Sequence, residues 1–129
     1  MKLLGTLLII GNHESLTGNP VPYERMTQRS KYKDDGAKRY IAWQEFVQLQ
    51  WLKQVGKLPD VKNGRYKISV SLLFKGENHG DPDNIFKGLI DSIFAKCGDK
   101  HVYGSVVFAH TGDARQKPEL RCIVMDENF

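Results

Sequence analysis

The spacing of apolar residues changes once within residues 66–97, and this change limits the folds open to the chain. Across 66–74, apolar residues alternate with polar ones, which is the period of a strand with one buried face. From residue 85 onward, Ile85, Leu89 and Ile93 recur every four residues, which is the spacing of one buried helix face. The sequence therefore predicts a strand, a polar loop and a helix of about residues 84–97 that ends at Gly98.

A second helical pattern covers residues 37–55, and Gly56 is typical of a helix end. Its apolar residues recur at steps of three and four, so we expect them to share one buried face. They are Tyr40, Trp43, Val47, Trp51 and Val55, with Ile41 and Leu52 widening the same stripe. The aromatic residues of this face are predicted to belong to the core rather than to a surface that stacks on bases.

Three further apolar runs, at 2–10, 102–109 and 119–125, predict strands, the last two joined by the polar turn Thr111-Gly112-Asp113. The order strand–helix–strand–helix–strand–strand predicts an α+β (mixed α/β) fold, in which one mixed sheet carries two helices. A length of 129 residues suits one domain over 1–129. The order of the strands within the sheet cannot be derived from these patterns.

The N-terminal run and the two cysteines bear on where the chain resides. The run 2–10 follows a single lysine, as in a short signal segment, but it has no small-x-small cleavage site and is too short to span a bilayer, so a core strand is favoured. Cys97 and Cys122 lie among apolar residues and have neither paired nor zinc-binding spacing. We expect reduced thiols and a cytoplasmic protein.

Basic residues gather in and after a long loop. The chain has 19 Lys+Arg against 15 Asp+Glu, a balance that is compatible with a polyanionic partner without requiring one. Residues 14–36 have no apolar period, and loops of such length in a compact domain are commonly functional. The basic side chains that such a partner would contact here are Arg25, Arg29, Lys31, Lys38 and Arg39. A solvated run of charges is the competing interpretation, and both stay open.

Two aspartates stand in the segment 80-GDPDN-84, between the predicted strand and the predicted helix. Pro82 fixes its own φ and favours an extended Asp81, and Asp83 is predicted to be the N-cap residue ahead of Asn84. Two carboxylates this close are hard oxygen ligands that suit Mg²⁺. The alternative is that they only cap the helix and complement its dipole.

Further charged residues follow on the same helix and after it. Asn84, Lys87 and Asp91 fall at i, i+3 and i+7, so they form a polar stripe opposite the apolar one. Lys87 lies one turn after Asp83, within reach of a phosphate bound at a metal ion. Asp99 follows Gly98, and a helix of about 14 residues is roughly 20 Å long, so Asp99 meets the earlier aspartates only if the chain folds back.

The run Asp81-x-Asp83-Asn84-x-x-Lys87, followed by Leu89-Ile90-Asp91 and then Gly98-Asp99-x-x-Val102, resembles the core signature of RusA-like crossover junction endodeoxyribonucleases. The earlier stretch Gly18-Asn19-Pro20-Val21-Pro22 with Arg25 resembles the early loop of that family, and the order of elements agrees over nearly the whole chain. The resemblance implies a homodimeric enzyme, dependent on one or two Mg²⁺ ions, that resolves four-way (Holliday) DNA junctions by paired nicks in recombination and repair.

The resemblance also implies roles for individual residues. Asp81, Asp83 and Asp99 would be metal ligands and, with Lys87, the catalytic residues. The residues that would contact the DNA backbone are Asn84 and the basic residues Arg25, Arg29, Lys31, Lys38 and Arg39. The chain departs from the family in having only Asp99 where a doubled acid is frequent, and in a shorter connection between Asp91 and Asp99.

Other residues near the motif have weaker alternatives. Glu77 is an alternative ligand, although a solvated loop position is favoured for it, and His79 and His101 are expected to be surface or supporting residues. Two other functions are considered. One is a non-catalytic DNA-binding module of the same fold. The other is a sugar-nucleotide transferase, which 129 residues leave little room for.

Overall fold

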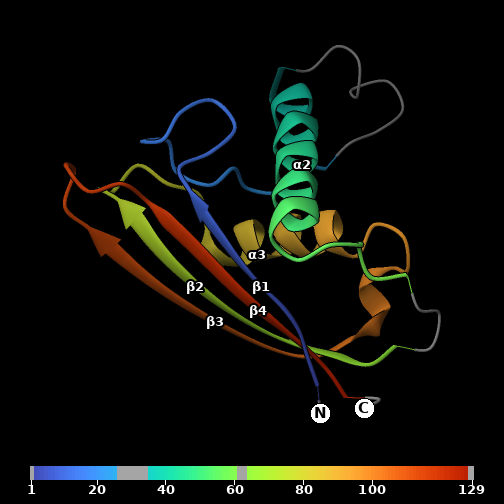
Figure 1. Cartoon of the computed structure of the whole chain (residues 1–129). Coiled ribbons are helices and arrows are strands. Elements are labelled where there is room, and N and C mark those ends of the chain that lie inside the picture. Colours follow the sequence, from blue (N-terminus) through green and yellow to red (C-terminus); the bar gives the residue numbers. More distant parts are fainter. Residues whose placement is uncertain (1, 26–34, 61–63, 128–129) are drawn as a thin grey trace.

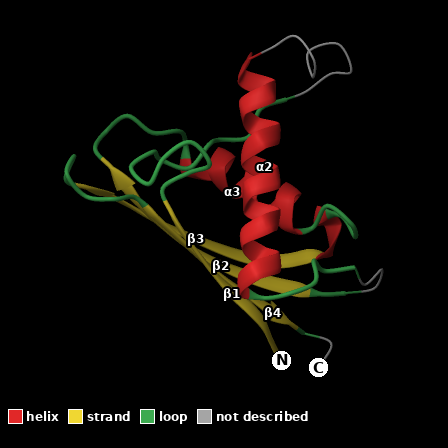
Figure 2. Ribbon diagram, turned by 45° about the horizontal axis from the view of Figure 1, so that its top comes forward, coloured by secondary structure: helices red, strands yellow, loops and turns green. Residues whose placement is uncertain are grey.

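A four-stranded mixed sheet carries both α-helices of the described residues on one of its faces (Figures 1 and 2). The computed structural model describes residues 2–25, 35–60 and 64–127. The strands are β1 (Lys2–Ile10), β2 (Tyr66–Lys75), β3 (Val102–Gly112) and β4 (Glu119–Asp126), and the α-helices are α2 (Asp35–Gln54) and α3 (Pro82–Ile93). A short 3₁₀ helix, η1 (Asp99–His101), precedes β3. The predicted α+β fold, a mixed sheet with two helices packed on it, is confirmed.

The strands are arranged in the order β1-β4-β2-β3. β2 and β3 are parallel, whereas β4 is antiparallel to both β1 and β2. α3 makes the crossover between the two parallel strands, which is the connection that parallel neighbours require. Because β2 and β3 run in the same direction, the loop after β2 and the segment before β3 lie at opposite ends of this strand pair.

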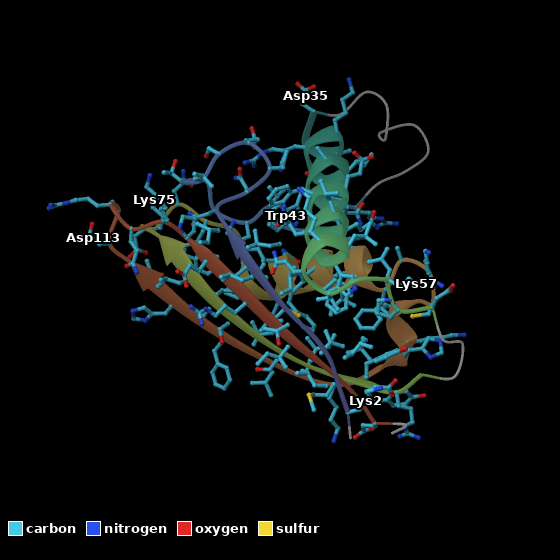
Figure 3. The ribbon with its side chains drawn as sticks, in the orientation of Figure 1. Lys2, Asp35, Trp43, Lys57, Lys75 and Asp113 are labelled. Carbon is cyan, nitrogen blue, oxygen red and sulfur yellow. The ribbon has the colours of Figure 1, made fainter. Side chains whose placement is uncertain are left out.

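The core lies between the sheet and the two helices. The buried face of α2 contributes Tyr40, Trp43, Val47 and Trp51, and Figure 3 shows Trp43 directed from α2 toward the sheet. The prediction that these aromatic residues belong to the core is confirmed. Leu52, which was expected to widen the same stripe, is 51% exposed because it lies on the solvent side of α2.

The ends of α2, α3 and β3 differ most from the predicted ones, whereas β2 and β4 each end one residue later than predicted. α2 begins at Asp35, two residues before the predicted start, and α3 spans Pro82–Ile93 rather than 84–97. After Ile93, the chain continues in hydrogen-bonded turns to Gly98, whose φ of +93° favours glycine. β3 extends to Gly112 because Thr111 and Gly112 still pair with Phe74 and Lys75, so the predicted turn begins later.

The length and composition of the two α-helices bear on whether either could span a membrane. Neither α2 nor α3, within the part of the chain described, offers an apolar stretch long enough to cross a bilayer.

Candidate active site

Asp81 and Asp83 open helix α3, but in positions that differ from the predicted ones. Asp81 is the N-cap residue: its backbone is extended (φ −63°, ψ 131°), and its Oδ1 accepts a hydrogen bond from the Asp83 N–H at 3.2 Å. The prediction that Asp83 caps the helix is therefore wrong. The reason is Pro82, which occupies the start of the helix, where the missing N–H costs nothing. Both carboxylates are exposed.

The loop over 76–80 that leads to these aspartates is fastened to the N-terminal loop. Asn19 donates from Nδ2 to the carbonyl oxygens of Lys75 and Asn78, each at 3.0 Å, and its Oδ1 accepts from the Lys75 N–H at 2.8 Å. His79 stacks on Phe74 with ring centroids 3.7 Å apart. These contacts tie the loop to the N-terminal loop and to the end of β2.

Lys87 lies one turn after Asp83 on α3, and its ammonium group rests on an aromatic ring. The Nζ atom is 4.1 Å from the centroid of the Tyr23 ring, which is a cation–π contact. Tyr23 packs edge-on against Tyr40 of α2, with centroids 5.5 Å apart, and its N–H donates to the Asn84 carbonyl oxygen at 2.9 Å. The N-terminal loop and both helices therefore position Lys87 together.

Asp91 and Asp99 line one cavity of about 210 Å³ between α3 and β3, and Lys87 lines it as well. The Tyr40 hydroxyl donates to Oδ2 of Asp91 at 3.5 Å. Burial raises the pKa of Asp91 above its usual range and the charge of Asp99 raises it further, whereas Lys87 and the Tyr40 hydrogen bond lower it. A carboxylate in this state is stabilised in its charged form by a cation placed beside it.

The predicted ligand set of Asp81, Asp83 and Asp99 is divided between two places in the chain. The first two aspartates follow the C-terminal end of β2, whereas Asp99 precedes the N-terminal end of β3. The 12-residue helix α3 lies between them and is about 18 Å long. Within residues 2–25, 35–60 and 64–127, no three His, Cys, Asp or Glu side chains are grouped closely enough to hold a metal ion.

Asp91 is the candidate site residue that the predicted ligand set lacks. It lines the same cavity as Asp99, whereas the prediction had placed Asp81 and Asp83 beside Asp99. The spacing of Asn84, Lys87 and Asp91 on one helix face was the signal in the sequence that pointed to it. The pairing with Asp99 depends on how the chain returns to β3, which no local pattern encodes.

The donor chemistry of each place fits a hard cation. In proteins Mg²⁺ takes one or two carboxylates and completes its shell with water or phosphate oxygens, so a pair of aspartates suffices. The pair Asp91 and Asp99 fits better, because the charge of Asp99 raises the electrostatic cost of charging Asp91 and a cation would relieve that cost. At the other place, one oxygen of Asp81 already serves the helix cap.

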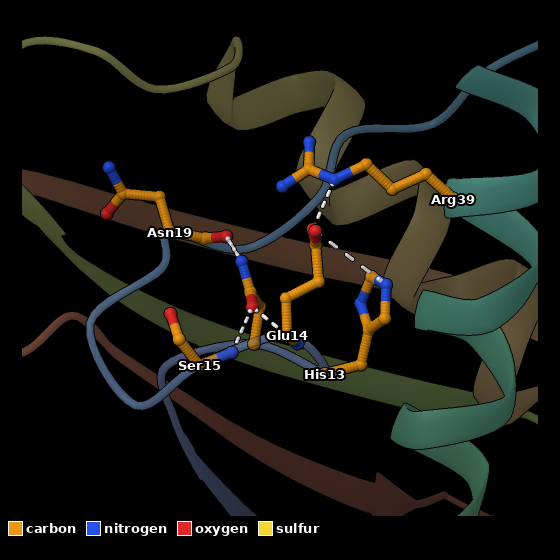
Figure 4. Close-up of polar contacts among 6 residues, drawn as sticks. His13, Glu14, Ser15, Asn19 and Arg39 are labelled. Atoms are coloured by element: carbon orange, nitrogen blue, oxygen red, sulfur yellow. Dashed lines mark hydrogen bonds and ion pairs between the residues drawn. The ribbon is translucent and has the colours of Figure 1, made fainter. Parts of the chain in front are cut away.

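The predicted DNA-contacting residues are described in part. Arg25, Lys38 and Asn84 are exposed, whereas Arg29 and Lys31 lie outside the described residues. Arg39 is exposed as well but forms an ion pair with Glu14, which Figure 4 shows together with the neighbouring His13. The Arg39 guanidinium holds the pKa of the Glu14 carboxyl below its usual range, so the pair is charged at neutral pH.

Two residues near the acids in the sequence, His101 and Glu77, differ in their exposure. His101 is buried, and its Nδ1 lies 3.0 Å from the carbonyl oxygen of Gly64. Glu77 is exposed in the loop after β2, in agreement with the solvated position favoured for it. Neither residue lines the cavity of Asp91 and Asp99.

Comparison of the sequence with protein-family models and with curated proteins gives no match. The resemblance to the junction endonucleases therefore rests on the motif residues alone.

Proposed function

We propose that the chain is a Mg²⁺-dependent, structure-selective endodeoxyribonuclease that resolves four-way (Holliday) DNA junctions by paired nicks during recombination and repair. The observation that carries the proposal is the cavity in which Lys87, Asp91 and Asp99 meet. One turn before Lys87 on α3 lies Asp83, so acidic groups stand on both sides of one ammonium group along a single helix face. Carboxylates that hold a cation next to a fixed ammonium group would stabilise the negative charge that develops on a reacting phosphodiester.

Each side chain has a role in this proposal. The metal ligands would form two pairs, Asp81 with Asp83 at the start of α3 and Asp91 with Asp99 near its other end, and each pair could hold one Mg²⁺. When bound, Mg²⁺ would supply a water nucleophile that is active at neutral pH and would neutralise charge on the scissile phosphate. Lys87, held against the Tyr23 ring, would stabilise the negative charge that develops on the phosphate oxygens.

The partner proposed for the site is branched DNA. Arg25, Lys38, Arg39 and Asn84 would contact its backbone, which gives affinity without sequence preference. A homodimer is proposed because two strands are to be cut symmetrically. A cytoplasmic location is also proposed, and it is supported by Cys97 and Cys122, both of which are free thiols.

The alternative is a DNA-binding module of the same fold that does not cut. The exposed basic residues at the start of α2 support binding equally under either function. The two functions differ in what Mg²⁺ does to a bound junction, since only the nuclease converts it into nicked duplexes.

The test is incubation of the chain with a synthetic four-way junction, a linear duplex and a single strand, each with and without Mg²⁺. We expect symmetric nicks only in the junction and only with Mg²⁺. Asp83→Asn and Asp99→Asn should each abolish nicking and leave junction binding intact. Asp113→Asn, in the exposed turn after β3, is the matched control and should cut normally.

Two results would contradict the proposal. Junction binding without nicks in Mg²⁺ would favour the binding module. Full nicking by Asp99→Asn would remove the Asp91–Asp99 cavity from the mechanism.

A further inference from the structure

A second, larger pocket lies between the N-terminal loop, the first turns of α2 and the loop after β2. Its volume is about 590 Å³, within the roughly 300–1,000 Å³ that small-molecule sites occupy. Among the described residues that line it, two are cationic, Arg39 of α2 and Lys75 of β2, and none is acidic. Neutral groups that can hydrogen-bond to a ligand are also present, among them Thr17, Asn78 and His79. The lining therefore suits an anion that carries further polar groups.

The walls of this pocket are held by hydrogen bonds between segments far apart in the chain. The buried Asn12 side chain donates from Nδ2 to the Asn19 carbonyl oxygen at 2.9 Å, and its Oδ1 accepts from the Glu14 N–H at 2.8 Å. Asn19 in turn bonds the main chain of Lys75 and Asn78. A ligand would therefore enter a pocket that is already formed, and little binding free energy would be lost in ordering its walls.

The two cations of the pocket differ in what balances their charge. Arg39 forms an ion pair with Glu14, whose carboxylate is directed at the guanidinium in Figure 4. Lys75, in contrast, forms no ion pair with the described residues. The Glu14 side chain is 52% exposed, and exposed ion pairs contribute little to stability, so an anion in the pocket can displace it at little cost. The guanidinium thus already holds an anionic group, supplied by the chain itself.

We propose that this pocket binds a single nucleotide through a terminal phosphate group, whose charge Arg39 and Lys75 would balance. A terminal phosphate carries close to two negative charges at neutral pH, which matches two cations once Glu14 has moved away. Its oxygens would accept charge-assisted hydrogen bonds from both side chains, and a guanidinium can donate two of them in parallel. The sugar and base would occupy the rest of the pocket, against Asn78 and His79.

A terminal nucleotide phosphate has two sources, a free mononucleotide and the 5′-phosphorylated end of a DNA strand. The inference goes beyond the proposed function, because none of the residues that line this pocket is a proposed metal ligand. The pocket shares Arg39 with the proposed DNA contacts, but its test does not depend on nicking. A chain that binds nucleotides and leaves junctions uncut would keep this site, and one that nicks junctions without binding nucleotides would lack it.

The test is a titration of the full, isotope-labelled chain with thymidine 5′-monophosphate in the absence of Mg²⁺, followed by NMR of the backbone amides. We expect saturating shifts at millimolar concentration or below, gathered on residues 17–19 and 78–80. Inorganic phosphate should shift the same amides and compete with the nucleotide. Thymidine, which lacks the phosphate, should bind at least about 100-fold more weakly, because two charge-assisted contacts are lost.

Two variants test the phosphate contacts. Lys75→Gln should raise the dissociation constant of the nucleotide at least about tenfold, because one charge-assisted contact is lost. The contacts of Lys75 with Asn19 come from its main chain, so the variant keeps the walls of the pocket. Lys53→Gln, exposed in the last turn of α2, makes the same change of net charge and is the matched control, which should bind like the unaltered chain.

A 5′-phosphorylated trinucleotide of thymidine distinguishes the two sources. Binding at least as tight as that of the mononucleotide would assign the pocket to strand ends, and weaker binding would assign it to free nucleotides. The absence of shifts at millimolar mononucleotide would overturn the proposal. Equal weakening by Lys75→Gln and Lys53→Gln would overturn it as well, because the effect would then be one of net charge and not of this pocket.

Discussion

At the scale of single residues, the pKa of Asp91 is set by several opposing interactions. Burial and the charge of Asp99 raise its pKa, whereas Lys87 and the Tyr40 hydroxyl lower it. Burial also raises the pKa of Tyr40 itself, so this hydroxyl stays protonated and keeps donating to Asp91. The balance leaves a carboxylate that is less stable when charged than an exposed one, within reach of a second carboxylate.

The pH dependence of stability follows from the sign of this shift. A raised pKa in the folded protein means that the contribution of Asp91 is fully present below the unfolded pKa and is lost as the pH rises through the folded pKa. Asp91→Asn removes this loss and keeps an acceptor for Tyr40. In urea unfolding at pH 3.5 and pH 7 without Mg²⁺, the variant should gain relative to the unaltered chain at pH 7, by less than about 1 kcal/mol because solvent screens a half-exposed charge.

Thermal unfolding of the same two proteins, with and without Mg²⁺, separates the proposed metal role of Asp91 from a merely structural one. At pH 7 the ion should raise the unfolding temperature of the unaltered chain more than that of Asp91→Asn, because binding to the folded state stabilises it. Equal shifts in the two proteins would show that the Asp91–Asp99 pair does not hold the ion.

Lys87 depends on Tyr23 for its position, and this contact predicts a graded effect on cleavage. Tyr23→Phe keeps the ring beneath the ammonium group, whereas Tyr23→Leu removes it. Exposed cation–π contacts contribute about 0.5–1 kcal/mol, so Tyr23→Leu should lower the rate of junction nicking about two- to fivefold. Single-turnover nicking rates measure this, and equal losses in the two variants would point to the hydroxyl rather than the ring.

At the scale of elements, Asp81 combines a helix cap with its proposed metal role, and two substitutions separate them. Asparagine caps a helix as well as aspartate does, whereas alanine costs about 1 kcal/mol. Asp81→Ala should therefore lower the free energy of unfolding by about that amount, and Asp81→Asn should change it by less than about 0.5 kcal/mol. Urea denaturation of both variants gives the comparison.

The nicking assay then completes the argument on Asp81. If the carboxylate holds Mg²⁺, both variants lose activity although only one loses stability. Nicking by Asp81→Asn at the unaltered rate would leave Asp81 with the cap alone.

Helices and strands could be predicted from the sequence where the signal for each element was local. The alternation across 66–74 and the periodic apolar residues of α2 and α3 are local, and the structure confirms the strands and helices that they predict. The start of α3 at Pro82 was missed because a proline suits both a loop and a first helical turn. The exposure of Leu52 was missed because the spacing of apolar residues does not define how wide the buried face of a helix is.

At the scale of the whole molecule, the arrangement of the acids depends on sheet topology. Strand order and the parallel pairing of β2 with β3 arise from contacts between distant segments, and no local pattern specifies them. The motif residues Asp81, Asp83, Lys87 and Asp99 were found from the sequence, but their division into two places was not. The crossover through α3 puts Asp99 beside Asp91 instead.

The net charge of +4 supplies a last prediction, which concerns how the whole surface meets DNA. Glu14 neutralises Arg39, and its lowered pKa keeps the pair charged at neutral pH, so a DNA phosphate must compete for this guanidinium. Glu14→Gln releases Arg39, and we expect tighter junction binding, with a slope of log K against log salt that steepens by up to about one. Glu45→Gln, exposed on α2, makes the same change of net charge and is the matched control. Binding isotherms without Mg²⁺ from 50 to 200 mM salt measure both. If the two variants gain equally, the effect is one of overall charge, and Arg39 contacts no phosphate.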